Sequence, residues 1–200
     1  MPESWMRTSE VANLSGNDHL HFVHPQANVD PVGKVTIGQR TRIWQFASVI
    51  RGTILGDDCN VAHGACLDGP WFGDRCIICH NVAMGPGFKI GDDVFIGPGV
   101  VFCNDMWPST KKDFGQGWSI EPFQQGQVTI EVGSGAIIGA NATILPGIRI
   151  GKGSVVAAGA VVAGNIPEGM LWTREGSVRT IPPLAKLMRM KLLTTLAGGS

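Results

Sequence analysis

The sequence predicts an all-β protein whose chain winds into stacked, three-sided coils. The first observation is that aliphatic residues recur at every sixth position, a period that matches neither an α-helix nor an ordinary strand. The second is that a small or moderate residue follows most of these aliphatic residues four positions later. The third is that glycine, asparagine or aspartate often follows them three positions later, and these types tolerate positive φ. Each hexad is therefore interpreted as a short extended piece and a tight corner.

The six-residue step runs through most of the chain. It slips by one residue near Trp71 and is interrupted between Cys103 and Gln127. Phe102 and Val132 are 132 − 102 = 30 positions apart, a multiple of six, so the phase survives the interruption. All eighteen repeat positions are apolar: Ile37, Ile43, Val49, Leu55, Val61, Leu67, Phe72, Ile78, Met84, Ile90, Ile96, Phe102, Val132, Ile138, Ile144, Ile150, Val156 and Val162.

Three hexads make a triangular coil of 18 residues. Stacking at the inter-strand spacing of ~4.8 Å lets backbone groups on each flat face pair with the next coil, and six or seven coils give a prism about 30 Å long. The aliphatic residues form the core, and the small residues fill its corners. A β-sandwich is the alternative, but sandwich strands do not keep an invariant six-residue step.

The chain divides into three parts on this pattern. We expect residues 1–24 to cap the first coil, residues 25–170 to form the coils with a loop at 103–127 extruded from one corner, and residues 171–200 to form a tail. Long loops on rigid repeats are usually functional. After Pro182 and Pro183, residues 184–196 place apolar side chains on one face of an α-helix. This helix is expected to pack on the prism or on a partner subunit; a basic membrane-lying helix is the alternative.

Composition and charge limit the partners and the cellular compartment that we expect for this chain. The 16 basic and 16 acidic residues balance, so no nucleic-acid or anionic-membrane partner is indicated. No apolar run approaches the ~20 residues of a membrane span, and the N-terminal residues do not resemble a secretory signal. Five cysteines, an odd number, are typical of a reduced, cytoplasmic chain.

The hexads resemble the left-handed parallel β-helix of the hexapeptide acyltransferases over nearly all of residues 25–170. The segments IWQFASVIRG, VFIGPGVVFCNDMWPS and GSGAIIGANATILPGIRIG further resemble the nucleotide-sugar N-acetyltransferases, closest to the branch that acts on 3-amino sugars. The resemblance implies acetyl-CoA as acyl donor along the C-terminal coils, and a UDP- or dTDP-linked deoxyamino sugar nearer the loop. It also implies a homotrimer with its sites between neighbouring prisms.

The expected reaction is direct attack of the sugar amine on the thioester, which requires an unprotonated, aligned amine. His80 lies two residues after inward Ile78, so its side chain is expected to point outward as a proton acceptor. The resembled family often has asparagine in this coil, and the alternative for His80 is an ordinary surface histidine. Asn81 fills a corner position, where asparagine fits for backbone reasons, and it is also a candidate to orient the amine.

The other candidate residues bind substrates. Arg51 is suited to a pyrophosphate because a guanidinium forks onto phosphate oxygens. The acceptor candidates that match family motifs are Trp44, Phe46, Arg51, Asn104, Asp105 and Glu121. The CoA candidates are the small residues Ala140, Ala158 and Gly159, which permit close approach, and the basic residues Lys152, Arg174 and Arg179 for its phosphates.

Two other functions remain open. Acetyl transfer to a serine or sugar hydroxyl needs a stronger base, normally a histidine with a carboxylate partner, and the sequence places no such partner. A carbonic anhydrase-like β-helix needs three convergent histidines, and His63 and His80 have no third partner in the coils. Cys76 is expected to face the core and no second cysteine pair exists, so the Cys76–Cys79 pair is not interpreted as a zinc site. His19, His21 and His24 form a loose cluster, which is expected to face solvent or to cap the first coil rather than to bind a metal.

Overall fold

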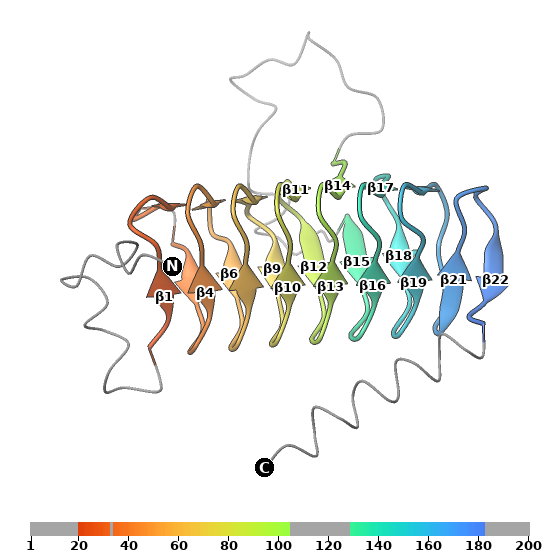
Figure 1. The fold of residues 1–200 in the computed structure, drawn as a ribbon, viewed down its shortest axis with the longest axis horizontal. Helices are drawn as coiled ribbons and strands as arrows, with labels where there is room; N and C mark the ends of the chain where they lie inside the picture. The colour runs from red at the N-terminus through yellow and green to blue at the C-terminus, as the bar shows by residue number, and fades with distance from the viewer. Residues whose placement is uncertain (1–19, 33, 105–128, 183–200) are drawn as a thin grey trace, which may run out of the picture.

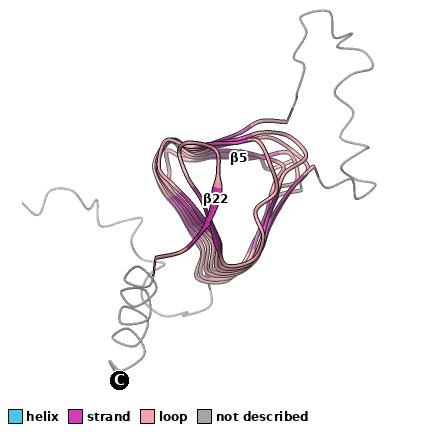
Figure 2. Ribbon diagram, turned by 90° about the vertical axis from the view of Figure 1, so that its right-hand side faces the viewer, coloured by secondary structure: helices cyan, strands magenta, loops and turns pink. Residues whose placement is uncertain are grey.

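The computed structural model describes residues 20–32, 34–104 and 129–182, which form a prism of stacked coils with a triangular cross-section (Figures 1 and 2). Three sheets form its walls. Neighbouring strands are parallel throughout, except for one antiparallel pair, β21 and β22. The chain thus folds as the predicted parallel β-helix; its left-handed sense stays a prediction.

Each coil contributes one short strand to each wall. Sheet A contains β1 (Phe22–Val23), β4 (Arg42–Ile43), β7 (Asn60–Val61), β10 (Ile77–Ile78), β13 (Phe95–Ile96), β16 (Ile137–Ile138), β19 (Val155–Val156), β21 (Met170–Trp172) and β22 (Val178–Thr180). Sheet B contains β2 (Asn28–Val29), β5 (Ser48–Ile50), β8 (Cys66–Asp68), β11 (Ala83–Met84), β14 (Val101–Phe102), β17 (Thr143–Ile144) and β20 (Val161–Val162). Sheet C contains β3 (Thr36–Ile37), β6 (Ile54–Leu55), β9 (Trp71–Phe72), β12 (Phe88–Ile90), β15 (Ile130–Val132) and β18 (Arg149–Ile150).

The turns between the walls stack into three edges. The A/B edge consists of residues 24–27, 44–47, 62–65, 79–82, 97–100, 139–142 and 157–160. The C/A edge consists of residues 38–41, 56–59, 73–76, 91–94, 133–136 and 151–154. The B/C edge contains the remaining turns, including residues 51–53, 69–70 and 85–87, and the predicted loop leaves β14 at this edge.

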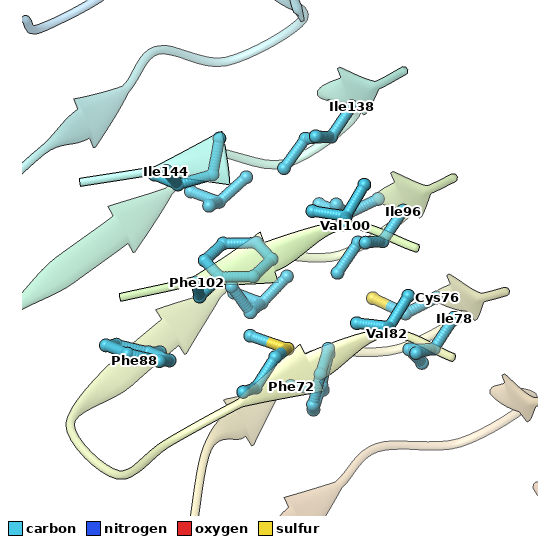
Figure 3. Packing of buried hydrophobic residues seen from close by; sticks show 14 of the residues in the cluster. Phe72, Cys76, Ile78, Val82, Phe88, Ile96, Val100, Phe102, Ile138 and Ile144 are labelled. Atoms are coloured by element: carbon cyan, nitrogen blue, oxygen red, sulfur yellow. The ribbon is translucent and has the colours of Figure 1, made fainter. Parts of the chain in front are cut away.

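The core confirms the six-residue period. All eighteen predicted positions are buried or pack against the buried cluster, and Ile78, Ile96 and Ile138 stack with no exposed surface (Figure 3). The small or moderate residues four positions later also face inward. The buried ones are Thr41, Ala47, Thr53, Cys59, Ala65, Cys76, Val82, Val94, Val100, Ala136, Ala142, Ser154 and Ala160. Buried Thr41 and Thr53 bond to backbone carbonyls, and no buried side-chain nitrogen or oxygen in the described part lacks a partner.

The predicted one-residue slip shortens one coil. Thr36 and Ile54 are register partners 54 − 36 = 18 residues apart, whereas Ile54 and Trp71 are 71 − 54 = 17 apart. Gly69 makes the short turn with φ +86°, and a Cβ there would lie 3.1 Å from the carbonyl oxygen of Arg51. Any other residue at this corner would be strained, which favours glycine.

Charged side chains connect successive coils along the C/A edge. Arg40 pairs with Asp58 at 2.6 Å, and Arg75 pairs with Asp93 at 2.7 Å. The hydrogen bonds from Arg75 lower the pKa of the Asp93 carboxyl. All of these side chains remain partly exposed, so each pair contributes little to stability at high ionic strength.

We expect the Asp93→Asn substitution to reduce the acid sensitivity of the prism. A carboxyl whose pKa is lowered by folding stabilises the fold above its unfolded pKa of about 4, and that stability is lost as the pH falls through the folded pKa. Asparagine also tolerates the positive φ of 57° at this position. Urea midpoints measured from about pH 6 downward should fall less steeply for the variant below pH ~4. Identical slopes for the two proteins would contradict this.

The two ends of the prism extend the predicted repeat region. β1 begins at Phe22, within the expected cap, and pairs with β4. β21 and β22 form a hairpin on the last coil, in a segment expected to be tail. The helix predicted from Leu184 lies outside the described residues. In the described ranges no helix is long and apolar enough to cross a membrane.

Candidate active site

The A/B edge brings most of the predicted site residues into one line. Gly99 N–H donates to His80 O at 2.9 Å, Asn141 N–H to Pro98 O at 2.8 Å, and Gly159 N–H to Ala140 O at 2.8 Å. These bonds stack the turns of successive coils directly above one another. Ala140 is consequently two coil steps from His80, about 10 Å, at the usual spacing between strands.

His80 and Asn81 occupy the middle of this edge. His80 is exposed, as predicted, in the turn that follows β10. Asn81 has a φ of 57°, and its Oδ1 lies over Gly64 of the preceding coil, 2.4 Å from where a Cβ on that glycine would be. The structure thus gives Asn81 a clear role in the corner, whereas the His80 side chain is directed to solvent.

Aromatic side chains continue the edge toward the N-terminus. The Phe46 ring meets His63 edge-on at 5.3 Å between ring centroids, and His63 lies 6.3 Å from His80. Trp44 donates its indole N–H to Asn60 Oδ1 at 2.8 Å and packs against Phe22 at 5.5 Å. His63 was not among the predicted site residues. The repeat could have identified it, because the 17 residues that separate it from His80 make up the shortened coil.

Small residues and one arginine continue the edge toward the C-terminus. Ala140, Ala158 and Gly159 are all partly or fully accessible in the turns that follow β16 and β19. Arg174 lies in the turn between β21 and β22, and its Cδ approaches Gly159, 3.9 Å from where a Cβ on that glycine would be. Glu175 follows it, and its pKa is lowered by its own backbone amide and by the Thr173 hydroxyl.

Two predicted basic residues lie elsewhere. Lys152 is exposed in the last turn of the C/A edge, across sheet A from Ala158. Arg179 is exposed on β22, opposite Leu171. Within one chain, Lys152 is therefore not part of the line that contains Ala140, Ala158 and Arg174.

The B/C edge contains the other acceptor candidates. Arg51 has a φ of 49°, and its guanidinium forms a bidentate ion pair with Asp68 of the next coil. The Asp68 hydrogen bond raises the pKa of Arg51. Asn104 is exposed at the end of β14, with its amide over Gly85. Asp105 and Glu121 lie outside the described residues. The pairing of Asp68 with Arg51 was not among the sequence-based predictions.

The A/B edge can perform a modest set of chemical steps. An exposed imidazole can accept a proton from an attacking group. Beside it, a surface of small residues ending at a guanidinium suits a long ligand that carries phosphate groups. In the described ranges no group of three or more His, Cys, Asp or Glu residues could hold a metal ion.

Comparison with known families matches two parts of the prism. Residues 129–164 match the family of bacterial transferase hexapeptides (six repeats). Residues 34–68 match the hexapeptide repeat of succinyl-transferase. Both matched segments belong to the coils described above, one on each side of residues 103–127.

Individual relatives agree with these matches. The bifunctional protein GlmU of Geobacillus sp. (strain WCH70) is 28% identical over 195 residues, covering 76% of this chain and 41% of that protein. The chain thus spans less than half the length of the curated relatives it matches.

Two solved structures share the fold. The UDP-N-acetylglucosamine acyltransferase of Francisella novicida has a TM-score of 0.55 at 16% identity, covering 86% of this chain and 72% of its own. The acetyltransferase domain of PglB from Neisseria gonorrhoeae has a TM-score of 0.51 at 20% identity, covering 86% and 62%.

Proposed function

We propose that this hexapeptide-repeat acyltransferase is an acetyl-CoA-dependent N-acetyltransferase, and that its acceptor is the amino group of a UDP- or dTDP-linked deoxyamino sugar. The observation that carries the proposal is the line of His80, Ala140, Ala158 and Arg174 on one edge. The acetyltransferase domain of PglB and the UDP-N-acetylglucosamine acyltransferase share the fold. Both names support acyl transfer, and the second includes a UDP-linked sugar.

The donor occupies the C-terminal half of the A/B edge in this proposal. Its pantetheine lies along Ala140, Ala158 and Gly159, where short side chains permit close approach, and its phosphates meet Arg174. The thioester then reaches His80. The sugar amine attacks the thioester carbon, the C–S bond breaks, and His80 accepts the amine proton. His80 then returns this proton to the thiolate, so CoA leaves as the thiol.

The amine is a better acceptor than a hydroxyl for this site. A hydroxyl is a weak nucleophile and needs a base that is strengthened and oriented by a carboxylate. Among the ion pairs of the described residues, none joins a carboxylate to His80. An unassisted imidazole is sufficient for an amine, which attacks once it is unprotonated and aligned.

The acceptor residues on the B/C edge require a second copy of the chain. Arg51 and Asn104 are separated from His80 by the width of sheet B. One prism therefore cannot bring all of them to one ligand. A homotrimer in which the A/B edge of one prism faces the B/C edge of the next brings them together.

An acceptor panel tests the proposal. The purified protein is incubated with acetyl-CoA and with UDP- and dTDP-linked amino sugars, and released thiol is measured. The matching hydroxyl sugars serve as controls. Thiol release with an amino sugar supports the proposal. Release only with the hydroxyl sugars favours O-acetylation, and no release with any acceptor rejects the proposal.

We expect Arg174 to bind acetyl-CoA and not the amino sugar. Replacing it with alanine removes a charge-assisted contact, so KM for acetyl-CoA should rise about tenfold, while KM for the amino sugar should not change. Lys89→Ala is the control, since Lys89 is an exposed lysine on β12 of sheet C, away from the A/B edge. Equal effects of the two substitutions would exclude Arg174 from donor binding.

A further inference from the structure

His63 lies next to the proposed base but has no part in the chemistry described above. It is in the turn after β7, one coil before His80, and the Asn81 N–H donates to its carbonyl oxygen at 3.2 Å. The two imidazole rings are tilted by 46°, with their centroids 6.3 Å apart. They form adjacent steps of one ladder along the A/B edge.

The Phe46 ring packs against the His63 ring, edge-on at an angle of 82°. The Asn81 amide lies over Gly64, the residue that follows His63. His63 is consequently half-buried, whereas His80 is exposed. A ring fixed in this way loses little conformational entropy when it binds a ligand.

Phe46 itself occupies an unfavourable backbone conformation. Its φ is 59°, a value that a bulky side chain rarely adopts. The equivalent corners of later coils contain Gly64, Asn81, Gly99, Asn141 and Gly159, the types suited to that conformation. Phe46 also exposes 57% of its surface. A strained, exposed aromatic ring beside His63 points to function rather than to packing.

The ring nitrogens of His63 can also hydrogen-bond a ligand. Across the residues that the structure describes, no hydrogen bond joins either ring nitrogen of His63 to another group. Ala140, Ala158 and Arg174, the proposed donor surface, lie on the other side of His80. A ligand group that reaches His63 therefore belongs to the acceptor.

We propose that His63 is the acceptor-positioning residue, and that its imidazole hydrogen-bonds a hydroxyl of the sugar ring close to the reacting amine. The inference rests on the proposed function. One coil step, ~4.8 Å, separates His63 from His80, and a pyranose places an amine and a nearby hydroxyl on a comparable scale. Phe46 packs on the imidazole, whose ring centroid lies 6.3 Å from that of His80. His63 thus selects among amino sugars by the hydroxyl they present.

Acceptor binding tests this role separately from turnover. The protein is saturated with CoA, and the amino sugar that gives the fastest turnover in the acceptor panel is titrated in a calorimeter. His63→Ala should raise the acceptor Kd about tenfold and leave the CoA Kd unchanged, as expected for one lost hydrogen bond to a polar group. His63→Gln, which keeps a donor and an acceptor, should recover part of the loss. An analogue lacking the hydroxyl should bind wild type and His63→Ala alike.

Two further substitutions test whether the change in acceptor Kd is specific to His63. His24→Ala alters another histidine of the same edge, whose Nδ1 already accepts the Gln26 N–H at 3.1 Å, and it should leave the acceptor Kd unchanged. Phe46→Asn places at this corner the residue found at 81 and 141, so the fold should keep its melting temperature while the acceptor Kd rises.

The measurements distinguish a failure of the His63 role from a failure of the proposed function. A wild-type enzyme that turns over amino sugars, with an unchanged acceptor Kd in His63→Ala, overturns the role of His63 alone. An altered oligomeric state in that variant also overturns it, because His63 would then hold the prisms together rather than position the acceptor. A wild-type protein that neither turns over nor binds any amino sugar rejects the proposed function itself.

Discussion

Replacing His80 with alanine is expected to lower kcat by about 10² to 10⁴-fold, the usual contribution of a positioned general base. The amine must lose a proton as it attacks the thioester, and among the described residues His80 is the exposed imidazole at the meeting point of the two proposed substrates. KM for acetyl-CoA should change little, because the donor contacts lie on later coils.

The same substitution should leave the fold intact. His80 is exposed, in a turn whose backbone bond to Gly99 does not involve the side chain. The melting temperature is therefore expected to stay within a degree or two of wild type, as for other surface substitutions. His21→Ala, another exposed histidine, is the control. Steady-state rates that are equal for wild type and both variants would remove His80 from the chemistry.

Replacing Phe88 with alanine is expected to lower the free energy of unfolding by about 3 to 5 kcal/mol, as found for large-to-small changes in cores. Phe88 is 1% exposed and pairs with Phe102 at 5.7 Å (Figure 3). The two rings fill the prism where β14 ends at the B/C edge. Because hydrogen bonds between coils fix their spacing, the walls cannot collapse into the cavity.

A second phenylalanine provides the matched control. Phe95 points out of sheet A and is 38% exposed, so Phe95→Ala should cost about 1 kcal/mol or less. Urea unfolding of the two variants measures the difference. Similar losses for Phe88→Ala and Phe95→Ala would mean that the core does not lie inside the prism.

The six-residue period predicted the fold because it reports the geometry of the chain directly. Each inward residue, from Ile43 to Val162, follows from the phase alone, and the structure confirms these positions. The slip at Trp71 was visible for the same reason. The β21–β22 hairpin was not predicted, because the six-residue period that identified the other strands does not continue into its segment.

The site was predictable only in part, because residue type does not say which edge a turn occupies. Ala158 and Lys152 are six residues apart, and one hexad moves a residue to a neighbouring edge. Counting in coils of 18 separates them and links Ala158 with Ala140. The ion pair of Arg51 with Asp68 and the contact of Phe46 with His63 depend on the neighbouring coil. A single stretch of sequence does not show them.

A crystal structure of the protein bound to CoA is the most direct measurement of the proposed site. We predict that the pantetheine lies along Ala140, Ala158 and Gly159, with its phosphates at Arg174 and its sulfur beside His80. CoA bound along the C/A edge, or on a wall of the prism away from His80, would contradict the assignment of the A/B edge as the place of acetyl transfer.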